Sequence, residues 1–354
     1  MAAITIKNLL VFLLLAFVFI HYIVPNLGQE YLSRCFGYIL SIILAYVIAV
    51  NVKEGKVQVT GKAVVVTGCD RGIGNALARY LDRQGFRVFA GCLFETGAGA
   101  QKLKRECSRK LQVVQMDVTS DEQVAEVARF IQTDVAVSGD VLWGVVNNAG
   151  IVMIGEIEWL SFDSYRQVIE VNLMGMIRVT KAFLPMIRKC KGRIVNVSSA
   201  QGLHAAPYYS PYGISKFGVE AFSDCLRLEM DKWGVKTVII QPGNFSAFSE
   251  VGEGNNIDKM LGLVWSGTPD HIKQVYGEDY FNNLLKLVKT QRSMGVQHDL
   301  KSLLSGIEDA LIAVNPPDRL LIAEPKLFAF FVHTFPATLT DYFYKVFMLT
   351  SKDK

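Results

Sequence analysis

The sequence predicts an α/β fold with a doubly wound parallel sheet, and three observations support this prediction. Short apolar runs alternate with amphipathic segments of helical period between residues 61 and 243. The runs are rich in β-branched residues and apolar on both faces, which is typical of strands buried in a parallel sheet. A glycine-rich turn follows the first run and opens the first amphipathic segment. Strands and helices that alternate in this way form a sheet covered by helices on both faces.

The N-terminal segment has a different composition. Residues 9–24 and 35–50 are almost wholly apolar, and each run is slightly shorter than the roughly 20 residues of a spanning helix. No small-residue cleavage site follows the first run, and the segment lacks the Arg- and Ser-rich composition of a mitochondrial presequence. We therefore expect residues 1–55 to be a membrane anchor of one or two helices. Lys7, Lys53 and Lys56 flank the runs and favour a cytoplasmic main domain.

The main domain is expected to span residues 56–325. Its strands are expected at 62–68, 86–93, 111–119, 141–150, 192–199, 235–243 and 318–324, and its helices at 75–85, 121–135, 163–190 and 211–233. Thr119 or Ser120 is expected to cap the second helix. The alternation becomes irregular after residue 243, so 244–300 are expected to be loop and helix. Residues 326–354 are apolar and aromatic, and we expect a helical cap over a pocket or a segment on the membrane surface.

Composition excludes several classes of function. The net charge of +4 is small for 354 residues, and no basic run is interleaved with aromatic residues, so a nucleic-acid partner is not expected. The six cysteines form no CxxC pair, which favours reduced thiols. Cysteines and histidines do not cluster with metal-ligand spacing, so no metal site is expected.

The turn TGCDRGIG, residues 67–74, has the chemistry of a phosphate-binding loop. Gly68, Gly72 and Gly74 stand in a T-G-x-x-x-G-x-G spacing. Glycines let the backbone approach a pyrophosphate closely, and the following helix offers free N–H groups and the positive end of its dipole. Glycine triplets alone are a weak signal, but this one follows a strand and opens a helix, as the motif requires. The turn therefore predicts a dinucleotide site.

The choice between NAD and NADP stays open. A dinucleotide site often has an acid at the end of the second strand to bind the ribose 2′-OH. Gly91 and Cys92 stand there instead, and Glu95 comes a few residues late. Arg71 lies inside the glycine-rich turn, where a cation can meet a 2′-phosphate. It is equally compatible with an ordinary surface charge.

Small and polar residues follow the third and fourth strands. Asp117 can accept a hydrogen bond from the adenine amino group or serve the start of the next helix. In the motif NNAG, Asn147 can tie neighbouring strands, while Ala149 and Gly150 leave room for a ribose. The ends of these strands border the expected cofactor cleft.

A tyrosine and a lysine stand four residues apart at the start of the helix 211–233. Tyr212 and Lys216 therefore share a helix face, and a nearby ammonium lowers the pKa of a phenol toward the working pH. Such a phenol can act as a general acid or base. Ser199, at the end of the preceding strand, can hold a substrate oxygen. Asn172 lies inside an expected helix, which indicates a kink, a bound water or a satisfied buried amide.

Taken together, TGCDRGIG, NNAG, Asn172, Ser199 and YGISK resemble the short-chain dehydrogenase/reductase family over about residues 61–250. The resemblance implies a Rossmann-type fold in which Tyr212 is the general acid/base and Lys216 binds the nicotinamide ribose. It also implies that Ser199 orients the carbonyl and that Asn172 anchors a proton-relay water. The implied cofactor contacts are Gly68, Arg71, Gly72, Ile73, Gly74, Asp117, Val118, Asn147, Ala149, Gly150, Tyr212, Lys216, Pro242, Gly243 and Phe245.

Within the family, RVFAGCL and KFGVEAFSDCLRLEM are most similar to the branch of D-β-hydroxybutyrate, retinol and 17β-hydroxysteroid dehydrogenases. That branch mostly has a neutral residue where Arg71 stands, and it favours NAD. An anchored enzyme with an aromatic tail suits a lipophilic, steroid- or retinoid-like alcohol. The alternatives are D-3-hydroxybutyrate oxidation and, in another class, a non-catalytic lipid- or nucleotide-binding protein.

The resemblance and the apolar segments also imply a location and partners. We expect an endoplasmic-reticulum membrane protein with a cytoplasmic-facing catalytic domain, or alternatively a mitochondrial membrane protein. A second copy of the chain is a further expected partner, because proteins of this fold often dimerise through the long helices, including the one that carries Tyr212.

Overall fold

The structure, a computed structural model, describes residues 41, 55–245, 256–294, 299–322 and 337–343. The chain divides into two compact units, Lys56–His333 with Ser351–Lys354 and Met1–Gly55 with Thr334–Thr350. In the second unit the structure shows helix α13 (Ala337–Phe343). The expected apolar helices at 9–24 and 35–50 lie outside the described residues, apart from residue 41. No helix of the described part of the chain is long and apolar enough to cross a membrane.

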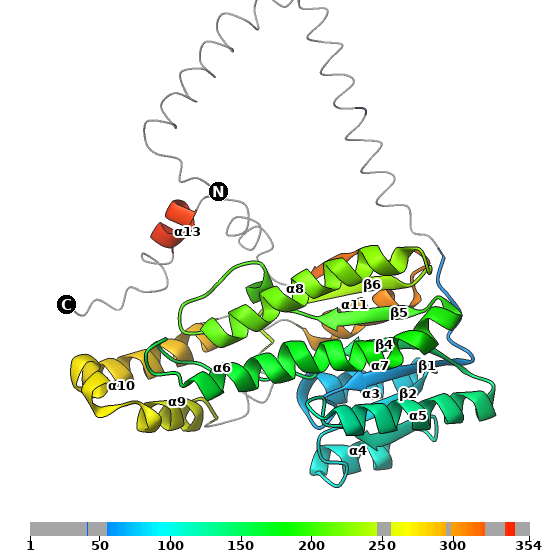
Figure 1. Cartoon of the computed structure of the whole chain (residues 1–354), viewed down its shortest axis with the longest axis horizontal. Coiled ribbons are helices and arrows are strands. Elements are labelled where there is room, and N and C mark those ends of the chain that lie inside the picture. The colour runs from blue at the N-terminus through cyan, green and yellow to red at the C-terminus, as the bar shows by residue number, and fades with distance from the viewer. Residues whose placement is uncertain (1–40, 42–54, 246–255, 295–298, 323–336, 344–354) are drawn as a thin grey trace, which may run out of the picture. The chain divides into compact units, whose positions relative to one another are not determined.

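The larger unit contains one sheet of seven parallel strands in the order β3-β2-β1-β4-β5-β6-β7 (Figure 1). The chain runs outward from β1 to β3, returns to the centre at β4, and runs outward again to β7. This confirms the doubly wound prediction. The strands are β1 (Lys62–Thr67), β2 (Arg87–Cys92), β3 (Leu111–Gln115), β4 (Val141–Asn147), β5 (Arg193–Val197), β6 (Lys236–Pro242) and β7 (Arg319–Ile322).

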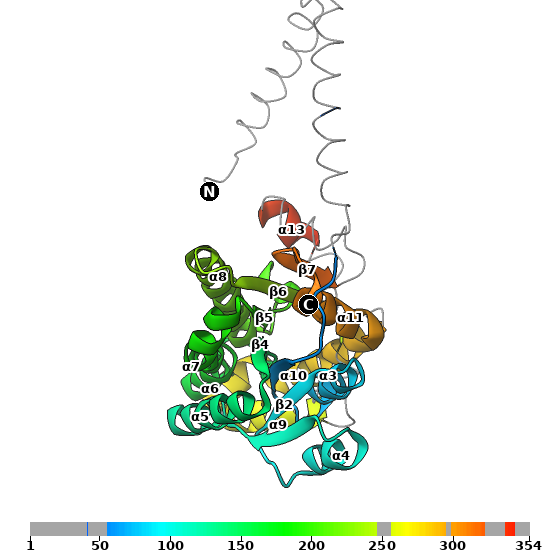
Figure 2. The ribbon, with the colours of Figure 1, turned by 90° about the vertical axis from the view of Figure 1, so that its right-hand side faces the viewer.

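Helices cover both faces of the sheet (Figure 2). One face carries α3 (Gly72–Arg83), α4 (Ala98–Glu106) and α11 (Leu300–Ile312), and the other carries α5 (Asp121–Ser138), α7 (Gly175–Cys190) and α8 (Ser210–Asp231). Because strand side chains alternate, Val64 packs into the first core and its neighbour Val65 into the second. Both faces of the strands are therefore buried.

Three helical segments differ from the sequence prediction, one of which is α11, at residues where no helix was expected. The expected helix at 163–190 is divided into α6 (Phe162–Ile169), the π-helical turn η3 (Glu170–Met174) and α7. Asn172 lies in η3, so the irregularity that it indicated is present. Helix α4 was not predicted, because it follows Gly97, begins with Ala-Gly-Ala and buries only Ala100 and Leu103.

The segment between β6 and β7 adds a helical insert with its own small core. Its helices α9 (Asn256–Gly267) and α10 (Asp270–Met294) pack Leu261 and Trp265 against Trp159 and Ile154 from the segment after β4. Trp159 and Trp265 meet edge to face with ring centroids 4.7 Å apart. The chain beyond β4 and the chain beyond β6 thus form one structure next to the carboxyl ends of the strands.

Candidate active site

The glycine loop, residues 67–74, joins β1 to α3 in a shape that needs its glycines. Gly68 and Gly72 have φ angles of 71° and 60°, in the left-handed region. An added Cβ at Gly74 would lie 2.1 Å from the carbonyl oxygen of Gly68. Helix α3 begins without a side-chain cap and without an acidic residue in its first turn. The loop and the N–H groups at the start of the helix therefore fit a pyrophosphate.

Two polar residues fasten the glycine loop to the end of β4. The hydroxyl of Thr67 accepts hydrogen bonds from the backbone N–H groups of Asn148 (3.0 Å) and Ala149 (2.9 Å). The side-chain amide of Asn148 donates to the Thr67 carbonyl (2.9 Å). This places Ala149 beside Gly68, whose added Cβ would lie 2.8 Å from the Ala149 Cα. The sequence analysis did not identify Thr67 or Asn148, although each lies inside a quoted motif.

An acid lies at the end of β2, but it comes from the glycine loop. The Asp70 carboxylate accepts hydrogen bonds from the backbone N–H groups of Leu93 and Phe94, both at 2.9 Å. Arg71 is the exposed residue before α3. The acid was expected at the end of the second strand or shortly after it, where Glu95 stands, and Asp70 was therefore missed.

The predicted residues after β3 and β4 are held by side-chain hydrogen bonds. Asn147 ties two strands as expected, because its amide donates to Asn196 on β5 (2.8 Å) and to Thr180 on α7 (3.0 Å). Asp117 accepts from the backbone N–H and the hydroxyl of Thr119, and Ser120 is the residue that caps α5. Contact of Asp117 or its buried neighbour Val118 with adenine stays a prediction.

Ser199, Tyr212 and Lys216 come together at the carboxyl end of β5. The Ser199 hydroxyl lies close enough to the Tyr212 phenol to lower the pKa of that phenol. The Lys216 Nζ lies 5.5 Å from the centroid of the Tyr212 ring and donates a 2.8 Å hydrogen bond to the Val197 carbonyl. The hydroxyl, phenol and ammonium groups predicted from a strand end and a helix turn are thus neighbours in space.

The expected direction of the Tyr212 pKa shift is wrong for this structure. Burial raises the pKa of Tyr212, and the Ser199 hydroxyl only partly opposes the rise. Burial also lowers the pKa of Lys216 from 10.5 to about 8, while the charge of Glu220 acts in the opposite direction. Loss of hydration has the largest effect on the pKa of each group. Tyr212 therefore holds its proton at neutral pH.

Asn172 fixes the chain beyond NNAG to the π-helical turn. Its side-chain oxygen accepts from the Ile151 N–H (2.7 Å), and its amide donates to the Ile151 carbonyl (2.9 Å) and to the hydroxyl of Ser215 (3.0 Å). The side chain is thus the satisfied buried amide that was one of its three expected readings. Ser215 in turn donates to the Tyr212 carbonyl (2.7 Å), so Asn172 is linked to the start of α8. A role in anchoring a water stays a prediction.

The other predicted cofactor residues are partly buried or buried. Ile73 packs against the core beneath α3. Gly243 follows Pro242 at the end of β6 and donates to the Ile322 carbonyl (2.8 Å). The Phe245 side chain lies in the core and is 4% exposed. Cofactor contact at these residues stays a prediction.

A cavity of about 460 Å³ opens beyond Gly150. Ser199, Tyr212 and Lys216 are not among its lining residues, so this cavity does not contain the candidate catalytic groups. Most of its wall is apolar and comes from the chain after β4 and from α9: Ile151, Val152, Met153, Trp159, Met260, Leu263 and Val264.

The loop between η4 (Ala200–Gly202) and α8 is attached to the helical insert. Tyr208 has a φ of 72°, which is unusual for a residue with a side chain, and its carbonyl accepts from the Gly155 N–H (2.9 Å). Its side chain shares a hydrogen bond with Tyr280 of α10, and Tyr280 donates to Glu156 (2.6 Å). The insert and the loop before Tyr212 are therefore mechanically connected.

Comparison with known proteins agrees with this geometry. Residues 62–256 match the family model described as short chain dehydrogenase. The chain is 42% identical to the mitochondrial D-beta-hydroxybutyrate dehydrogenase of Rattus norvegicus, over 73% of this chain and 76% of that protein. It is 41% identical to 17-beta-hydroxysteroid dehydrogenase type 6 of Bos taurus (79% and 87% covered) and 38% identical to retinol dehydrogenase 7 of Mus musculus (79% and 86% covered).

A solved structure agrees at the level of the fold. A short chain dehydrogenase from Burkholderia cenocepacia, solved in complex with NADP, superposes with a TM-score of 0.58 at 21% identity, covering 81% of this chain and 98% of that one. The sheet order, the glycine loop and the Ser199–Tyr212–Lys216 group described above are consistent with the sequence match over 62–256. The chain therefore belongs to the short-chain dehydrogenase family and is an oxidoreductase that uses a nicotinamide cofactor, NAD or NADP.

Proposed function

We propose that this oxidoreductase interconverts a lipophilic secondary or allylic alcohol, steroid- or retinoid-like, with its carbonyl form at a membrane. The observation that carries the proposal is the grouping of Tyr212 with Ser199, which acts on the pKa of the phenol, and with Lys216, whose Nζ lies 5.5 Å from the centroid of the Tyr212 ring. When bound, the nicotinamide supplies or accepts the hydride. The residues for it are the glycine loop for the pyrophosphate and Lys216 for the nicotinamide ribose.

The side chains handle the proton and the oxygen atom of the substrate. Ser199 holds the carbonyl or hydroxyl oxygen by a hydrogen bond, in the place where it now contacts Tyr212. In reduction, Tyr212 donates its proton to that oxygen while hydride arrives at the carbon, and the raised pKa of the phenol ensures that the proton is present. In oxidation the Tyr212 phenol first releases its proton to solvent, and the phenolate, stabilised by the ammonium of Lys216, then accepts the proton of the alcohol.

The apolar cavity supports a lipophilic substrate. Its wall of aliphatic, methionine and tryptophan side chains removes apolar surface from water, which contributes on the order of 25 cal/mol per Å² of substrate surface. A volume of about 460 Å³ lies in the range of small-molecule sites, which is roughly 300–1,000 Å³. The 17-beta-hydroxysteroid and retinol dehydrogenases among the relatives carry the names of alcohols of this kind.

Membrane attachment is part of the proposal. The apolar runs 9–24 and 35–50 form the anchor, and the lysines that flank them place the catalytic domain on the cytoplasmic side of the endoplasmic reticulum, or alternatively on a mitochondrial membrane. A second copy of the chain is proposed to pack on α8, which exposes Ile214, Phe217 and Leu228. Neither nucleic acid nor metal enters this proposal.

D-3-hydroxybutyrate is the second candidate substrate, and one observation favours it. The cavity wall includes Gln167 and Lys259 beside its apolar residues. An ammonium and an amide suit the carboxylate of a hydroxy acid, which a steroid or a retinol lacks. Identity to the relatives of each name, 38–42%, does not separate the two substrates.

A substrate screen tests the proposal directly. The full chain, purified in detergent, is offered a 17β-hydroxysteroid, a retinol and D-3-hydroxybutyrate, each with NAD and with NADP, and reduced nicotinamide is followed by its absorbance. We expect turnover with one of the lipophilic alcohols and little with the hydroxy acid. Turnover of D-3-hydroxybutyrate alone would establish the second candidate.

Tyr212→Phe is the matched control, because it removes the phenolic oxygen and keeps the ring. It should reduce turnover by about 10²–10⁴-fold while the dissociation constant for the reduced cofactor, measured by its fluorescence, stays within about a factor of two of the wild-type value. A wild-type protein that binds cofactor and lipid but turns over none of the substrates would instead support a non-catalytic binding protein.

A further inference from the structure

Helix α8 carries a third charged or titratable group on the face of Tyr212 and Lys216. Glu220 follows Lys216 by four residues, the same interval that separates Lys216 from Tyr212, so the three side chains lie along one side of the helix. Glu220 is buried, with 8% of the residue exposed. A buried carboxylate requires a partner, because the loss of hydration is otherwise too costly.

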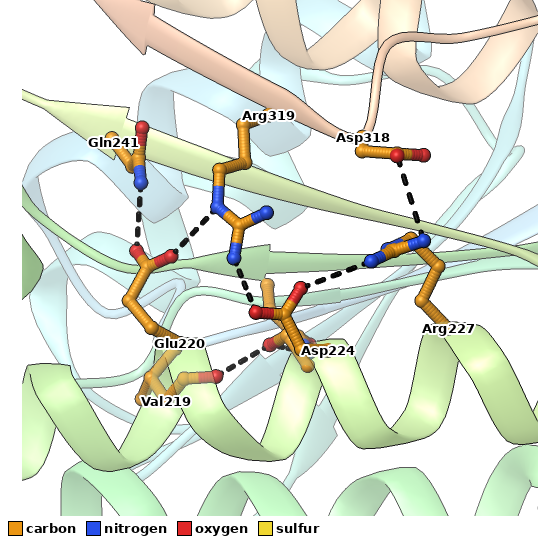
Figure 3. A network of polar contacts seen from close by, with 9 residues as sticks. Val219, Glu220, Asp224, Arg227, Gln241, Asp318 and Arg319 are labelled. Atoms are coloured by element: carbon orange, nitrogen blue, oxygen red, sulfur yellow. Dashed lines mark hydrogen bonds and ion pairs between the residues drawn. The ribbon is translucent and has the colours of Figure 1, made fainter.

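The partners of Glu220 come from the two strands at the edge of the sheet, as Figure 3 shows. One carboxylate oxygen accepts from the side-chain amide of Gln241 on β6 (3.0 Å), and the other accepts from Nε of Arg319 on β7 (3.2 Å). Arg319 also binds Asp224 at 2.5 Å, one turn further along α8. The side chain of Glu220 is only 11% exposed, against 36% for Arg319, so Glu220 is the inner member of the pair.

Glu220 also lies under the turn that carries Ser199. An added Cβ at Gly202 in η4 would lie 3.1 Å from Oε1 of Glu220 and 2.5 Å from the hydroxyl of Ser198. Ser199 caps η4, and Lys216 binds the Val197 carbonyl just before it. The carboxylate is therefore behind the catalytic groups and out of reach of a substrate above them.

Few charged groups lie near Lys216, and Glu220 is the one that acts on its pKa. In the described part of the chain, the charged groups on the elements that pack against α8 are Asp163 and Arg166 on α6, Glu170 on η3, Lys236 on β6, and Arg319 on β7 with Asp318 just before it. Lys236 pairs with Asp231 and Asp318 pairs with Arg227, both on α8 itself. Asp163 pairs with Arg166, and Glu170 pairs with Arg178 of α7. Glu220 is the charge that acts on the pKa of Lys216 and opposes the effect of burial.

We propose that Glu220 and Arg319 are positioning residues for the catalytic lysine. The carboxylate of Glu220 keeps the ammonium of Lys216 charged and held at the Val197 carbonyl, and Arg319 and Gln241 keep the carboxylate in place. The inference rests on the proposed role of Lys216, but its electrostatic part does not depend on which substrate is turned over. It assigns to β7 a contribution to the active site as well as to the edge of the sheet.

The inference predicts shifts of opposite sign for two substitutions. Glu220→Gln keeps the shape of the side chain but removes its negative charge, so Lys216 should lose its proton at a pH about one unit lower, the order expected for one partly screened unit charge four residues away on the helix. Arg319→Met removes the compensating cation, so Lys216 should keep its proton to a pH about half a unit higher. Arg319→Lys restores the cation. It should return the midpoint, the pH at which half of the Lys216 side chains are protonated, toward the wild-type value.

Asp224→Asn is the matched control. It makes the same change from carboxylate to amide one turn along α8, at a residue that binds Arg319 and not Lys216. Its midpoint should move by no more than about 0.2 units, because the side chain is farther away and 37% exposed. Thermal unfolding of each variant, with and without reduced cofactor, establishes that the fold and the cofactor site are intact.

The midpoint is measured without turnover. The rate at which acetic anhydride acylates Lys216 is followed against pH by mass spectrometry of the peptide, with the full chain folded in detergent. A lower midpoint in Glu220→Gln with a higher one in Arg319→Met supports the inference. Equal midpoints, or two shifts in the same direction, would overturn it. A wild-type enzyme that oxidises none of the alcohols refutes the proposed function, while the labelling experiment still decides the electrostatic inference.

Discussion

The glycine loop and the polar side chains around α8 are two halves of one site that are built in opposite ways. The glycine loop fits a pyrophosphate through its backbone N–H groups, and its shape comes from glycines within seven residues of one another. The second half relies on the half-buried phenol of Tyr212 and on a buried ammonium and carboxylate, Lys216 and Glu220, whose partners come from β5, β6 and β7. The backbone half therefore depends on room for close approach of the chain, whereas the side-chain half depends on the charge of its titratable groups. Steric crowding should affect the first half, and a change of pH should affect the second.

A change of pH should separate the halves most strongly, because backbone amides do not titrate and a buried ammonium does. The pKa of Lys216 falls from 10.5 to about 8 on burial. The charged lysine thus destabilises the folded state at every pH below 8, and this cost disappears as the pH rises from 8 to 10.5. The stability that Lys216→Met gains relative to the wild type should shrink by up to about 3 kcal/mol over that interval.

Urea unfolding at about pH 7 and about pH 10 measures this difference. Lys232→Met is the control, because Lys232 is an exposed lysine just beyond the same helix. A difference between Lys216→Met and the wild type that does not vary with pH would contradict the buried, titrating lysine.

Steric crowding of the glycine loop should weaken cofactor binding by an amount that does not depend on pH. Gly74→Ala places a Cβ 2.1 Å from the Gly68 carbonyl oxygen, so the loop must move. Overpacking of this kind costs about 2 kcal/mol, which corresponds to about a thirty-fold weaker affinity for NADH if the loop alone adjusts. Cofactor fluorescence measures the change, and Gly262→Ala on α9, where nothing lies within 4 Å, is the control. Unchanged affinity in Gly74→Ala would show that the loop is not a close-fitting site.

Asn172 connects the two halves, and its removal should have a smaller effect than either change described above. Asn172→Ala removes three hydrogen bonds, two of them to the backbone of Ile151. Because Ile151 is partly exposed, water replaces some of them, and we expect a loss of about 1–2 kcal/mol of unfolding free energy. Ser215→Ala loses the link to Asn172 but keeps both bonds to Ile151, and it should lose less. A larger loss in Ser215→Ala than in Asn172→Ala would contradict this account.

The smallest effect is expected on the choice of cofactor. Asp70 places a carboxylate at the end of β2, the region where a dinucleotide ribose is bound, and it should repel a 2′-phosphate. Asp70→Asn should raise the affinity for NADP relative to NAD by about five-fold, equal to about 1 kcal/mol for exposed charges in water. Parallel titrations with both reduced cofactors measure the ratio. A preference for NADP in the wild type would instead indicate that Arg71 dominates.

The sequence was sufficient for the features that depend on neighbouring residues. Each expected strand is present, since the composition of runs such as 62–68 is typical of buried strands, and the glycine loop was predicted from its spacing together with its place between a strand and a helix. Tyr212 and Lys216 were found because four residues make one helical turn. Ser120 was correctly included among the two expected caps of α5.

Contacts between residues that are far apart in the sequence could not be predicted from local patterns. Arg319 binds Glu220 across 99 residues, and no local pattern indicates that pairing. The fact that Glu220 continues the four-residue spacing of Tyr212 and Lys216 was an available signal. The direction of the Tyr212 pKa shift was misjudged because spacing shows a neighbouring charge but does not show burial, and burial has the larger effect.

The late position of Arg319 bears on how the protein is made. Glu220 leaves the ribosome 99 residues before its guanidinium partner, an interval on the order of 5–20 s at about 5–20 residues per second. The strands before β7 can associate during that time, while the acid next to the catalytic lysine lacks its counter-ion. The proposed catalytic lysine therefore lacks the fully paired Glu220 until β7 has been synthesised, and a chain interrupted before β7 would hold a sheet in which Glu220 has no guanidinium partner.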